Sequence, residues 1–439
     1  MTTETELWSA LLAAGPVRGT VSVPGSKSAS NRALILAAIA DGPSRITGLL
    51  DARDTQLMAD GLRLLGAEVH VVDHDDTGNL TVEVTPHFMR GPASIDVGLA
   101  GTVMRFLPPV AALAHGEIMF DGDAHARRRP MATVIESLKD LGVTVRDRGN
   151  GRLPFMVEGT GEVTGGEVFV DASKSSQFIS GLLLSAARFN AGVTIHHVGP
   201  PVPSMPHIEM TIAMLGEHGV HVRRSGDNIW HVDPQEIVAL DRTIEPDLSN
   251  AAPFQAAALV TDGSVSVRDW PTSTTQPGDL IRGVWEAMGA TVSRTADGLT
   301  VTSGETLLGV DLDLSDVGEV APTVAAVAAL ASSPSRLRGI AHLRGHETDR
   351  LAALTAEING LGGDVEETDD GLVIRPRPLH GGVFHTYDDH RMATAGAVLG
   401  LVIPGVEVED IATTGKTIPD FVDRWSRFVV HEATGEPSA

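Results

Sequence analysis

The sequence predicts an α/β protein built from six copies of one βαβαββ unit. Two series of positions support this prediction. Segments rich in Ala and Leu, each opening on polar residues, recur about every 70 to 74 residues. Glycines that close a second kind of segment recur at nearly the same interval. Similarity at a fixed spacing indicates a repeated structural unit, and six such units fill the 439 residues.

The Ala- and Leu-rich segments predict interior helices, because they are apolar on most faces. Their polar openings supply capping side chains. The unpaired N–H groups of a helix opening, together with the positive end of the helix dipole, attract anions. We therefore expect ligand groups at these openings. The six helices are expected to begin near Ser30, Gly101, Ser175, Ser249, Glu319 and Asp389.

The second helix of each unit is predicted to be amphipathic and to lie on the outside. PMATVIESLKDLG shows this pattern and ends on a glycine that should stop the helix. EIMFDG and GVTIHHVG predict strands between the two helices, and RGNGR and TADG predict short hairpins between the last two strands. The stopping glycines are Gly66, Gly142, Gly216, Gly289 and Gly362.

Six units can form either one ring or two lobes of three units each. A Pro/Ser-rich linker between the halves is absent from the sequence, and IEPDLSN lies between the third and fourth copies. We place the chain crossings near 23 and 246, so that one lobe is 24–246 and the other is 1–23 plus 247–439. The strand before Pro24 is expected to pair with the last unit. A cleft between two lobes would suit a polyanion.

The composition excludes several kinds of site and partner. The chain has no cysteine, which rules out disulfides, thiolate metal sites and a cysteine nucleophile, and suits a reducing compartment. A net charge of −24 disfavours nucleic acid and acidic membranes as partners. The first residues lack the positive region of a signal peptide, and the longest apolar run is too short to span a bilayer. We expect a cytoplasmic protein.

The few lysines lie at informative places. Lys27 and Lys416 are in the Gly-containing segments PGSKS and TTGKT, where a compact ammonium group suits an anion. In PGSKSASNRA, either Ser30 or Asn31 is expected to cap the helix. The same segment offers Lys27, Ser28 and Arg32 to a phosphate or carboxylate, although a purely structural cap explains the serines equally well.

Three further segments offer polar groups before a predicted helix. GLAGTVMR has glycines that allow close backbone approach to a ligand, Thr102 and, one turn later, Arg105; a tight strand-to-helix turn is the alternative. ARRRP has three arginines before a proline expected at the first helical position, and we expect at least one to bind an anion instead of only being solvated. SKSSQF offers Ser175, Ser176 and Gln177 as neutral hydrogen-bonding groups or as caps.

RGHETDRL is the densest group of ionisable residues. It differs from the zinc motif HExxH because Arg350 occupies the place of the second His, so we predict no metal. On a helix, Glu347 and Arg350 would share a face. They form either a surface ion pair or, with His346, a site for proton transfer beside a bound anion. DDHRM adds His390 and Arg391 at the sixth helix.

Together these motifs resemble the 5-enolpyruvylshikimate-3-phosphate synthase family. The resemblance extends from about residue 20 to residue 425 and includes PGSKSASNRA, GLAGTVMR, SSQF, HETDRL, YDDHRM and TTGKTIPDF. It implies a two-lobed inverse α/β barrel with three βαβαββ units in each lobe. It also implies transfer of the enolpyruvyl group of phosphoenolpyruvate to the 5-hydroxyl of shikimate 3-phosphate, with release of phosphate, on the pathway to chorismate and the aromatic amino acids. It implies no cofactor and no metal, and we expect a monomer.

The resemblance further implies roles for single residues. Glu347 would protonate the methylene carbon, and Glu319 would take the proton of the attacking hydroxyl; Lys27, Lys416 and His390 are also placed among the catalytic groups. Shikimate 3-phosphate would be bound by Lys27, Ser28, Arg32, Ser175, Ser176 and Ser204, with Gln177 between the substrates. The 247–439 lobe is the phosphoenolpyruvate side. Phosphoenolpyruvate would contact Lys27, Gly101, Thr102, Arg129, Arg350, Arg391 and Lys416, and Glu319 and His346 complete the substrate-binding set.

The chain departs from the family pattern at several positions. Glu319 stands where the family has Asp, and Leu99 replaces Asn in the Gly-Asn-Ala-Gly-Thr pattern. His207, His342 and His346 stand where the family has Tyr, Asn and Lys. Because imidazole titrates near neutral pH, we expect the pH profile and the polar contacts to differ from the family pattern.

Two other functions stay open on the sequence. The related enolpyruvyl transferases that act on UDP-N-acetylglucosamine use a reactive cysteine near the position of ARRRP, and this chain has none. A non-catalytic phosphate-binding module would keep the repeats and cations without turnover. The set of Lys27, Glu319, Glu347 and Lys416 favours an enzyme.

Overall fold

The structure is a computed structural model that describes residues 6–295 and 298–431. It divides into two compact units. Gly25–Glu245 is called the continuous unit, and Met1–Pro24 with Pro246–Ala439 is called the discontinuous unit. Within the described ranges, every helix is too short or too polar to span a bilayer.

Sheets of one recurring topology confirm the predicted repeat. In the described residues, five sheets have their strands in the order first, second, fourth, third of a βαβαββ unit. The first two strands are parallel, and the other neighbours are antiparallel. A parallel pair needs a crossover connection, which the interior helix provides in the second, third and fifth repeats. A sixth sheet has three strands in the order β1-β23-β22.

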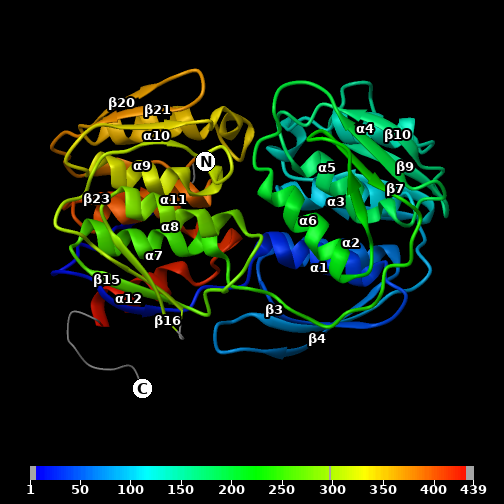
Figure 1. Ribbon diagram of the computed structural model, residues 1–439, viewed down its shortest axis with the longest axis horizontal. Helices are drawn as coiled ribbons and strands as arrows, with labels where there is room; N and C mark the ends of the chain where they lie inside the picture. The colour runs from blue at the N-terminus through cyan, green and yellow to red at the C-terminus, as the bar shows by residue number, and fades with distance from the viewer. Residues whose placement is uncertain (1–5, 296–297, 432–439) are drawn as a thin grey trace. The chain divides into compact units, whose positions relative to one another are not determined.

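The continuous unit contains the first three repeats (Figure 1). The first comprises α1 (Lys27–Ala38), β3 (Ser44–Leu49), α2 (Arg53–Leu65), β4 (Glu68–His74) and β5 (Leu80–Thr85), with β14 (Arg242–Thr243). The second comprises β6 (Ala93–Asp96), α3 (Gly101–Ala111), β7 (His115–Asp121), η1 (Ala126–Arg128), α4 (Ala132–Asp140), β8 (Thr144–Arg146) and β9 (Phe155–Thr160). The third comprises β10 (Gly166–Val170), α5 (Gln177–Ala186), β11 (Val193–His197), α6 (Pro206–Glu217), β12 (Val222–Arg224) and β13 (Ile229–Val232).

The discontinuous unit contains the other three repeats. The fourth comprises β2 (Arg18–Val21), α7 (Leu248–Val260), β15 (Ser264–Arg268), η2 (Pro277–Leu280), α8 (Ile281–Ala287), β16 (Thr291–Thr295) and β17 (Gly298–Thr302). The fifth comprises β18 (Asp311–Asp313), η3 (Gly318–Val320), α9 (Ala321–Ala329), β19 (Ser335–Arg338), η4 (Ala341–Gly345), α10 (Arg350–Gly360), β20 (Asp364–Glu367) and β21 (Leu372–Arg375). The sixth comprises β22 (Gly382–Phe384), α11 (His390–Gly400), β23 (Val406–Glu409), η5 (Ile411–Lys416) and α12 (Phe421–His431), with β1 (Leu7–Ser9).

Two of the repeats take their first strand from a distant part of the chain. β14 follows the third repeat but pairs in parallel with β3 of the first. β2 precedes the first repeat but pairs in parallel with β15 of the fourth. Two strands precede Pro24, and the prediction that the N-terminal strand pairs with the last unit does not hold for β2, which completes the fourth unit. The earlier strand β1 is the one that pairs with β23 of the last unit.

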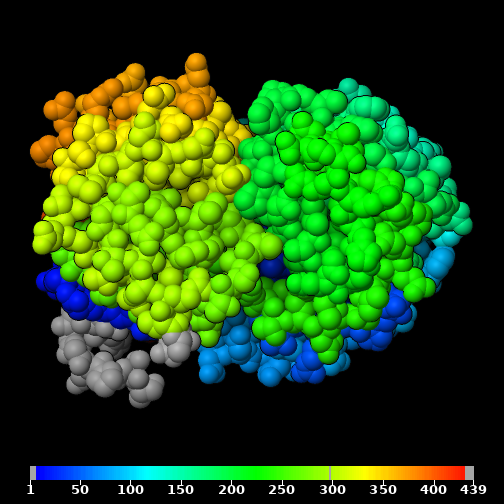
Figure 2. Space-filling model, in the orientation of Figure 1, coloured from blue at the N-terminus to red at the C-terminus, as the bar shows by residue number. Residues whose placement is uncertain are grey.

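The interior helices are buried as predicted. From Leu248 to Leu259, every residue of α7 is buried, and α9 is buried from Ala321 to Ala329. α7, α9 and α11 pack against one another in the discontinuous unit, as α1, α3 and α5 do in the continuous unit (Figure 1). On the face shown in Figure 2, the surface of the discontinuous unit is mostly yellow and yellow-green, the colours of its fourth and fifth repeats. Each unit thus has its own apolar core.

Several predicted boundaries are wrong. α1 begins at Lys27 and is capped by Ser26, whose Oγ accepts from Ala29 N at 3.4 Å; Ser30 and Asn31 lie inside the helix, so neither is the cap. Pro130 precedes the N-cap of α4 and is not at the first helical position. η1 ends at Arg128, the backbone of Arg129 is extended, and α4 begins only at Ala132, so Pro130 lies between the two helices.

The ends of the outer helices also differ in detail from the prediction. Gly66, Gly142, Gly289 and Gly362 have positive φ angles at or just after a helix end, where glycine avoids a steric penalty. α6 instead continues through Gly216 to Glu217. RGNGR lies in an irregular connection between β8 and β9, not in a two-residue turn. The TADG turn falls partly at 296–297, outside the described residues.

Candidate active site

Arg32 on α1 carries a buried positive charge in the continuous unit. Its side chain is 1% exposed; Nε donates to Thr211 Oγ1 at 2.7 Å and NH1 donates to the carbonyl of Ser28 at 2.9 Å. Within the described part of the chain, its hydrogen-bond acceptors are all hydroxyl or carbonyl oxygens. Burial lowers the pKa of Arg32 to about 9. An anionic ligand would stabilise such a cation, so Arg32 suits a phosphate or carboxylate.

Three polar side chains converge on Gly101, the first residue of α3. A Cβ built there would lie 2.9 Å from Arg105 NH1, closer than real Cβ atoms come to other groups. The same Cβ would lie 3.2 Å from Gln177 Oε1 and 3.3 Å from Arg129 NH2. The missing side chain therefore lets two guanidinium groups and one amide approach the opening of α3.

Arg105 determines which way the amide of Gln177 is oriented. Arg105 NH1 lies 2.7 Å from Gln177 Oε1. A guanidinium group can only donate, so the oxygen of the amide must face Arg105 and its NH2 group must point elsewhere. The ring of Phe178 lies under the Arg105 guanidinium, 5.3 Å from its carbon to the ring centroid. Gln177 is thereby prepared to donate hydrogen bonds to a ligand.

A second buried contact orients Thr102. Asn31 Nδ2 donates to Thr102 Oγ1 at 2.6 Å, and both side chains are buried. The contact joins α1 to α3 near the openings of both helices. Because the Thr102 oxygen accepts this hydrogen bond, its own hydrogen is available to donate to a ligand.

The other predicted groups of α1 and α5 lie at the openings of these helices. Lys27 Nζ is 3.4 Å from Asp54 Oδ2, so this ammonium already faces a carboxylate. Ser176 is the N-cap residue of α5, but its side chain makes no capping hydrogen bond. Ser175 Oγ accepts from Gln177 N at 3.3 Å. The serines thus serve partly as local caps, the structural alternative that the sequence left open.

Ser204 and His207 lie at the opening of α6. Ser204 has a positive φ of 54°, and its carbonyl accepts from His207 N at 3.0 Å. The carbonyl of His207 in turn accepts from Arg32 NH2 at 3.1 Å. This contact uses the main chain, so the replacement of the family's Tyr by His at 207 does not alter it.

The three arginines of ARRRP have separate environments. Arg127 donates to both carboxylate oxygens of Asp121, at 2.8 and 2.7 Å. Arg128 is exposed. Arg129 NH1 donates to the carbonyl of Leu99 at 3.3 Å, and Arg129 is the arginine of this run that lies near Gly101. The expectation of a ligand contact in this run therefore narrows to Arg129.

Arg350 is the centre of an ion-pair network in the discontinuous unit. Its side chain is fully buried; Nε donates to Asp389 Oδ2 at 2.7 Å and NH2 to Oδ1 at 3.1 Å. NH2 also lies 3.2 Å from Glu347 Oε2, and NH1 lies 3.6 Å from Glu319 Oε2. Burial opposes the charged form, but the three carboxylates more than offset it and raise the pKa of Arg350. The guanidinium group is thus charged and fixed on three sides.

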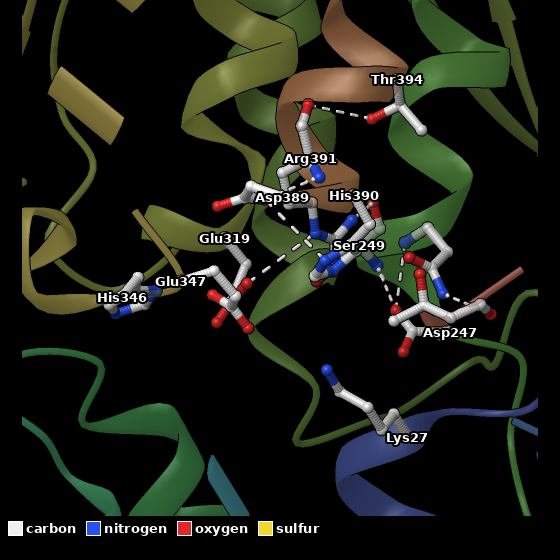
Figure 3. A network of polar contacts seen from close by, with 12 residues as sticks. Lys27, Asp247, Ser249, Glu319, His346, Glu347, Asp389, His390, Arg391 and Thr394 are labelled. Atoms are coloured by element: carbon white, nitrogen blue, oxygen red, sulfur yellow. Dashed lines mark hydrogen bonds and ion pairs between the residues drawn. The ribbon is translucent and has the colours of Figure 1, made fainter. Parts of the chain in front are cut away.

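Two further cations face the acids Glu347 and Glu319. Lys416 Nζ, at the end of η5, donates to Glu347 Oε1 at 2.5 Å, and both side chains are 11% exposed. Arg391 Nε lies 3.8 Å from Glu319 Oε2. Figure 3 shows the two glutamates side by side, close to Asp389 and Arg391. The fifth and sixth repeats therefore bring acids and cations to one place.

His390, the first residue of α11, lies beside Asp389. Its side chain is buried, and Nδ1 lies 3.8 Å from Asp389 Oδ1, which is too long for a hydrogen bond.

Glu319, His342 and His346 lie near Arg350, and the pKa of each of these three groups is lowered. Burial would raise the pKa of Glu319, but Arg350 and Arg391 hold it well below its ordinary value. Burial, and then Arg350, lower the pKa of His346 to about 3, and burial lowers that of His342. Arg350 NH1 lies 3.3 Å from His346 Nδ1, which must accept because guanidinium only donates. At neutral pH the position of the family's Lys is thus occupied by an uncharged group.

The expectation that Glu347 lies on a helix is wrong. α10 begins at Arg350, and Asp349 caps it by accepting from Ala352 N. Glu347 is in the bend between η4 and α10. Its contact with Arg350 survives because the bend folds back toward the first residue of the helix. A non-helical backbone frees Glu347 to reach Lys416 as well.

The helix openings are only partly available to anions. Asp247 caps α7 by accepting from Ser249 N and Asn250 N, and Asp389 caps α11 by accepting from Arg391 N. Carboxylates of the chain itself therefore occupy these openings. α3 has no side-chain cap among the described residues, and at α5 Ser175 Oγ accepts only from Gln177 N while Ser176 makes no capping hydrogen bond, so the expectation of an anion at the helix opening fits these two helices best.

Sequence reasoning missed three residues of this arrangement. Asp389 was read as a helix start, but its pairing with Arg350 joins positions far apart in the chain. Asn31 was considered only as a cap, and Arg105 was noticed without a partner. The helical spacing of Arg105 and Thr102 hinted at a shared face, but the distant partners gave no local signal. Within 6–295 and 298–431, no group of three or more His, Asp or Glu is placed to hold a metal ion.

Comparison with known proteins identifies similar chains. The model of the EPSP synthase (3-phosphoshikimate 1-carboxyvinyltransferase) family matches residues 12–425. A curated 3-phosphoshikimate 1-carboxyvinyltransferase from Kocuria rhizophila is 55% identical over 433 residues, which is 97% of each chain.

Solved structures show the same fold at lower identity. EPSP synthase from Acinetobacter baumannii superposes with a TM-score of 0.79 at 24% identity, covering 96% of this chain and 98% of that one. The enolpyruvyl transferase NikO from Streptomyces tendae superposes with a TM-score of 0.75 at 18% identity, covering 95% and 96%. The expected enolpyruvyl transferase fold is therefore confirmed.

Proposed function

The chain belongs to the EPSP synthase family, and from this premise we propose which of its residues carry out each step of the family reaction. The enzyme is a 3-phosphoshikimate 1-carboxyvinyltransferase of the shikimate pathway, which leads to the aromatic amino acids. It transfers the enolpyruvyl group of phosphoenolpyruvate to the 5-hydroxyl of shikimate 3-phosphate and releases phosphate. The two steps are addition, which forms a tetrahedral intermediate, and elimination of phosphate.

Glu347 is the proposed proton donor to the methylene carbon of phosphoenolpyruvate. Protonation makes the neighbouring carbon cationic, so that the 5-hydroxyl oxygen can form a bond to it. The close pair with Lys416 Nζ, 2.5 Å from Glu347 Oε1, supports this role because it fixes the carboxyl group in one position and offers it an ammonium proton to pass on. In the elimination step the same carboxylate would take a proton back from the methyl carbon as phosphate leaves.

Glu319 is the proposed acceptor of the proton of the attacking hydroxyl. Its pKa lies well below the ordinary value, with Arg350 and Arg391 outweighing burial, so it is ionised at neutral pH and can accept. The anionic groups of phosphoenolpyruvate would be bound by Arg350, Arg391 and Lys416. His346 would be a neutral neighbour, and His390 is the first residue of α11. For Gly101, Thr102, Arg129 and Lys27, which belong to the continuous unit, contact with this substrate stays a prediction from the family resemblance.

The continuous unit would hold shikimate 3-phosphate. Arg32 is the best-supported contact, because its buried charge faces neutral oxygens only among the described residues. The opening of α5, where Ser176 makes no capping hydrogen bond, supports contacts from Ser175 and Ser176, with Gln177 as an amide donor. Lys27, Ser28 and Ser204 would complete the set.

The observation that supports this assignment most strongly is the contact of Glu347 with both Lys416 and Arg350. It can be tested by following deuterium from heavy water into the methylene group of phosphoenolpyruvate and of the product. We expect Glu347→Gln to abolish this incorporation while shikimate 3-phosphate still binds. Unchanged incorporation would assign the proton to another group. UDP-N-acetylglucosamine, offered in place of shikimate 3-phosphate, should release no phosphate.

We also propose that the enzyme acts as a cytoplasmic monomer. The lack of cysteine suits a reducing compartment. Light scattering after size-exclusion chromatography should give 46.1 kDa, the mass of one chain. Twice that mass would contradict the monomer, and finding the native protein outside the cytoplasm on cell fractionation would contradict the location.

A further inference from the structure

Glu357 on α10 is a buried carboxylate whose partners are neutral groups. It is 5% exposed. Its Oε1 accepts from the hydroxyl of Tyr387 at 2.5 Å, and its Oε2 accepts from the main-chain N of His385 at 2.8 Å. A carboxylate in this position must keep its hydrogen bonds, because a buried charge without them is costly. Both partners belong to the segment 385–388, which leads into α11.

The backbone of that segment is strained. Tyr387 and Asp388 have φ angles of 56° and 58°, the left-handed region that bulky residues seldom enter. Such a conformation persists where the surroundings hold it. Glu357 holds this turn at two points, the amide of His385 and the side chain of Tyr387.

The strained turn ends at Asp389, the residue that binds Arg350. Arg350 and Glu357 lie on the same helix, seven residues apart, which is about two turns or 10 Å. Asp389 and Tyr387 lie on the same short segment. Two polar cross-links therefore join α10 to the start of α11: Arg350 with Asp389, and Glu357 with Tyr387.

We propose that Glu357, acting through Tyr387, is a positioning residue that sets the place of Asp389 and so the orientation of the Arg350 guanidinium group. This inference rests on the proposed role of Arg350 in binding phosphoenolpyruvate. If the turn relaxes, Asp389 moves and Arg350 loses the contact that directs NH1 and NH2 toward Glu319 and Glu347. The cost should fall on phosphoenolpyruvate more than on shikimate 3-phosphate.

The composition provides a direct probe of the contact. Tyr387 is the only tyrosine in the chain, so its ionisation can be followed by absorbance near ~295 nm without interference from other phenols. Burial and the hydrogen bond to Glu357 raise the pKa of Tyr387 to about 12. In Glu357→Gln we expect the pKa to fall toward, but not to, the ordinary value of 10.0, because burial and Glu409 still act on the phenol. Circular dichroism at each pH verifies that the fold persists.

The kinetic test uses Glu357→Gln, Tyr387→Phe and a matched control, Glu366→Gln. Glu366 is exposed and pairs with Arg375, so the control makes the same chemical change at the surface of the same unit. We expect KM for phosphoenolpyruvate to rise about tenfold in Glu357→Gln and in Tyr387→Phe, the loss expected for one hydrogen bond to a charged group. KM for shikimate 3-phosphate should stay within about twofold, and Glu366→Gln should match the wild type in both.

A separate variant distinguishes the role of Glu357 from the proposed role of Arg350 in binding phosphoenolpyruvate. Arg350→Lys tests the assignment, and unchanged KM for phosphoenolpyruvate in that variant would remove Arg350 from the binding set. If Arg350→Lys raises KM but Glu357→Gln and Tyr387→Phe do not, Glu357 has a purely structural role and the proposal fails. Equal changes in both KM values would also contradict it. Tyr387→Phe removes one hydroxyl from a side chain that is 41% exposed, so it keeps the test available if Glu357→Gln does not fold.

Discussion

Asp389 binds the guanidinium group of Arg350 through both carboxylate oxygens, and neither side chain is exposed to solvent. The same carboxylate accepts from Arg391 N and caps α11. One acid therefore orients an arginine on another helix and fixes the first turn of its own. Removing water from two charges is costly, so the pair is better explained by the orientation it gives Arg350 than by net stability.

Asp389→Asn should both destabilise the fold and impair the enzyme. The change replaces one of the three carboxylates around buried Arg350 by a neutral amide, a loss of about 1 to 3 kcal/mol in the free energy of unfolding. Denaturation in urea measures it. Asp364→Asn is the control, because Asp364 forms exposed pairs with Arg375 and Arg377 and should cost less than about 1 kcal/mol. If Asp389→Asn and Asp364→Asn lose the same small amount of unfolding free energy, the buried pair of Asp389 with Arg350 does not contribute to stability as predicted.

Lys416→Met should reduce turnover more than it reduces stability. Lys416 ends a short 3-10 helix and contacts Glu347, so its loss leaves the proposed proton donor without its closest cation. We expect kcat to fall at least about a hundredfold, as for other groups that act on a reacting proton. The measurement is phosphate release at saturating substrates. Lys139→Met changes an exposed lysine of the other unit and should leave kcat unaltered.

The repeat and its interior helices could be predicted because they depend on local signals. Apolar residues on most faces and polar openings recur in each copy, four outer helices end at a glycine, and the burial of α7 and α9 matches the apolar pattern. The exchange of first strands could not be predicted. β14 and β2 are short strands whose partners lie far away in the chain. Pairing at that distance depends on how the chain folds within each unit, which the local sequence does not show.

The candidate site was predictable in its residue types but not in its contacts. The clusters around Glu347 and Arg391 stood out because they gather unlike charges at helix openings. Their partners are set by packing: Asp389 meets Arg350 although they lie on different helices. The prediction that Glu347 lies on a helix is wrong because α10 begins only at Arg350, after its cap Asp349. The local sequence does not show whether Glu347 or Asp349 caps α10.

Glu319→Gln should change how stability depends on pH. The folded-state pKa of Glu319 lies below the unfolded-state value of about 4.5, because Arg350 and Arg391 outweigh burial. An acid with a lowered pKa contributes stability above its unfolded-state pKa and loses it as pH falls through the folded-state pKa. The difference in unfolding free energy between wild type and Glu319→Gln should therefore be constant above about pH 6 and shrink below about pH 4.5. A difference independent of pH down to the acid transition would contradict the lowered pKa.

Arg105→Met should weaken the contact of Gln177 with shikimate 3-phosphate. Without the guanidinium donor at 2.7 Å, the amide of Gln177 can turn and present its oxygen to the ligand. We expect KM for shikimate 3-phosphate to rise about tenfold, the effect of one misdirected hydrogen bond. Arg188→Met is the control, since Arg188 is exposed just beyond the end of α5. If Arg105→Met behaves like this control, the amide orientation does not depend on Arg105.

Glu347 is proposed to act on the reacting proton and not only on substrate binding. The most direct measurement compares single-turnover rates and equilibrium binding of both substrates for wild type and Glu347→Gln. We expect the rate to fall by about 10² to 10⁴ while the dissociation constants change less than about threefold. A variant that turns over at the wild-type rate, or one whose whole defect is weaker binding, would contradict the role of Glu347.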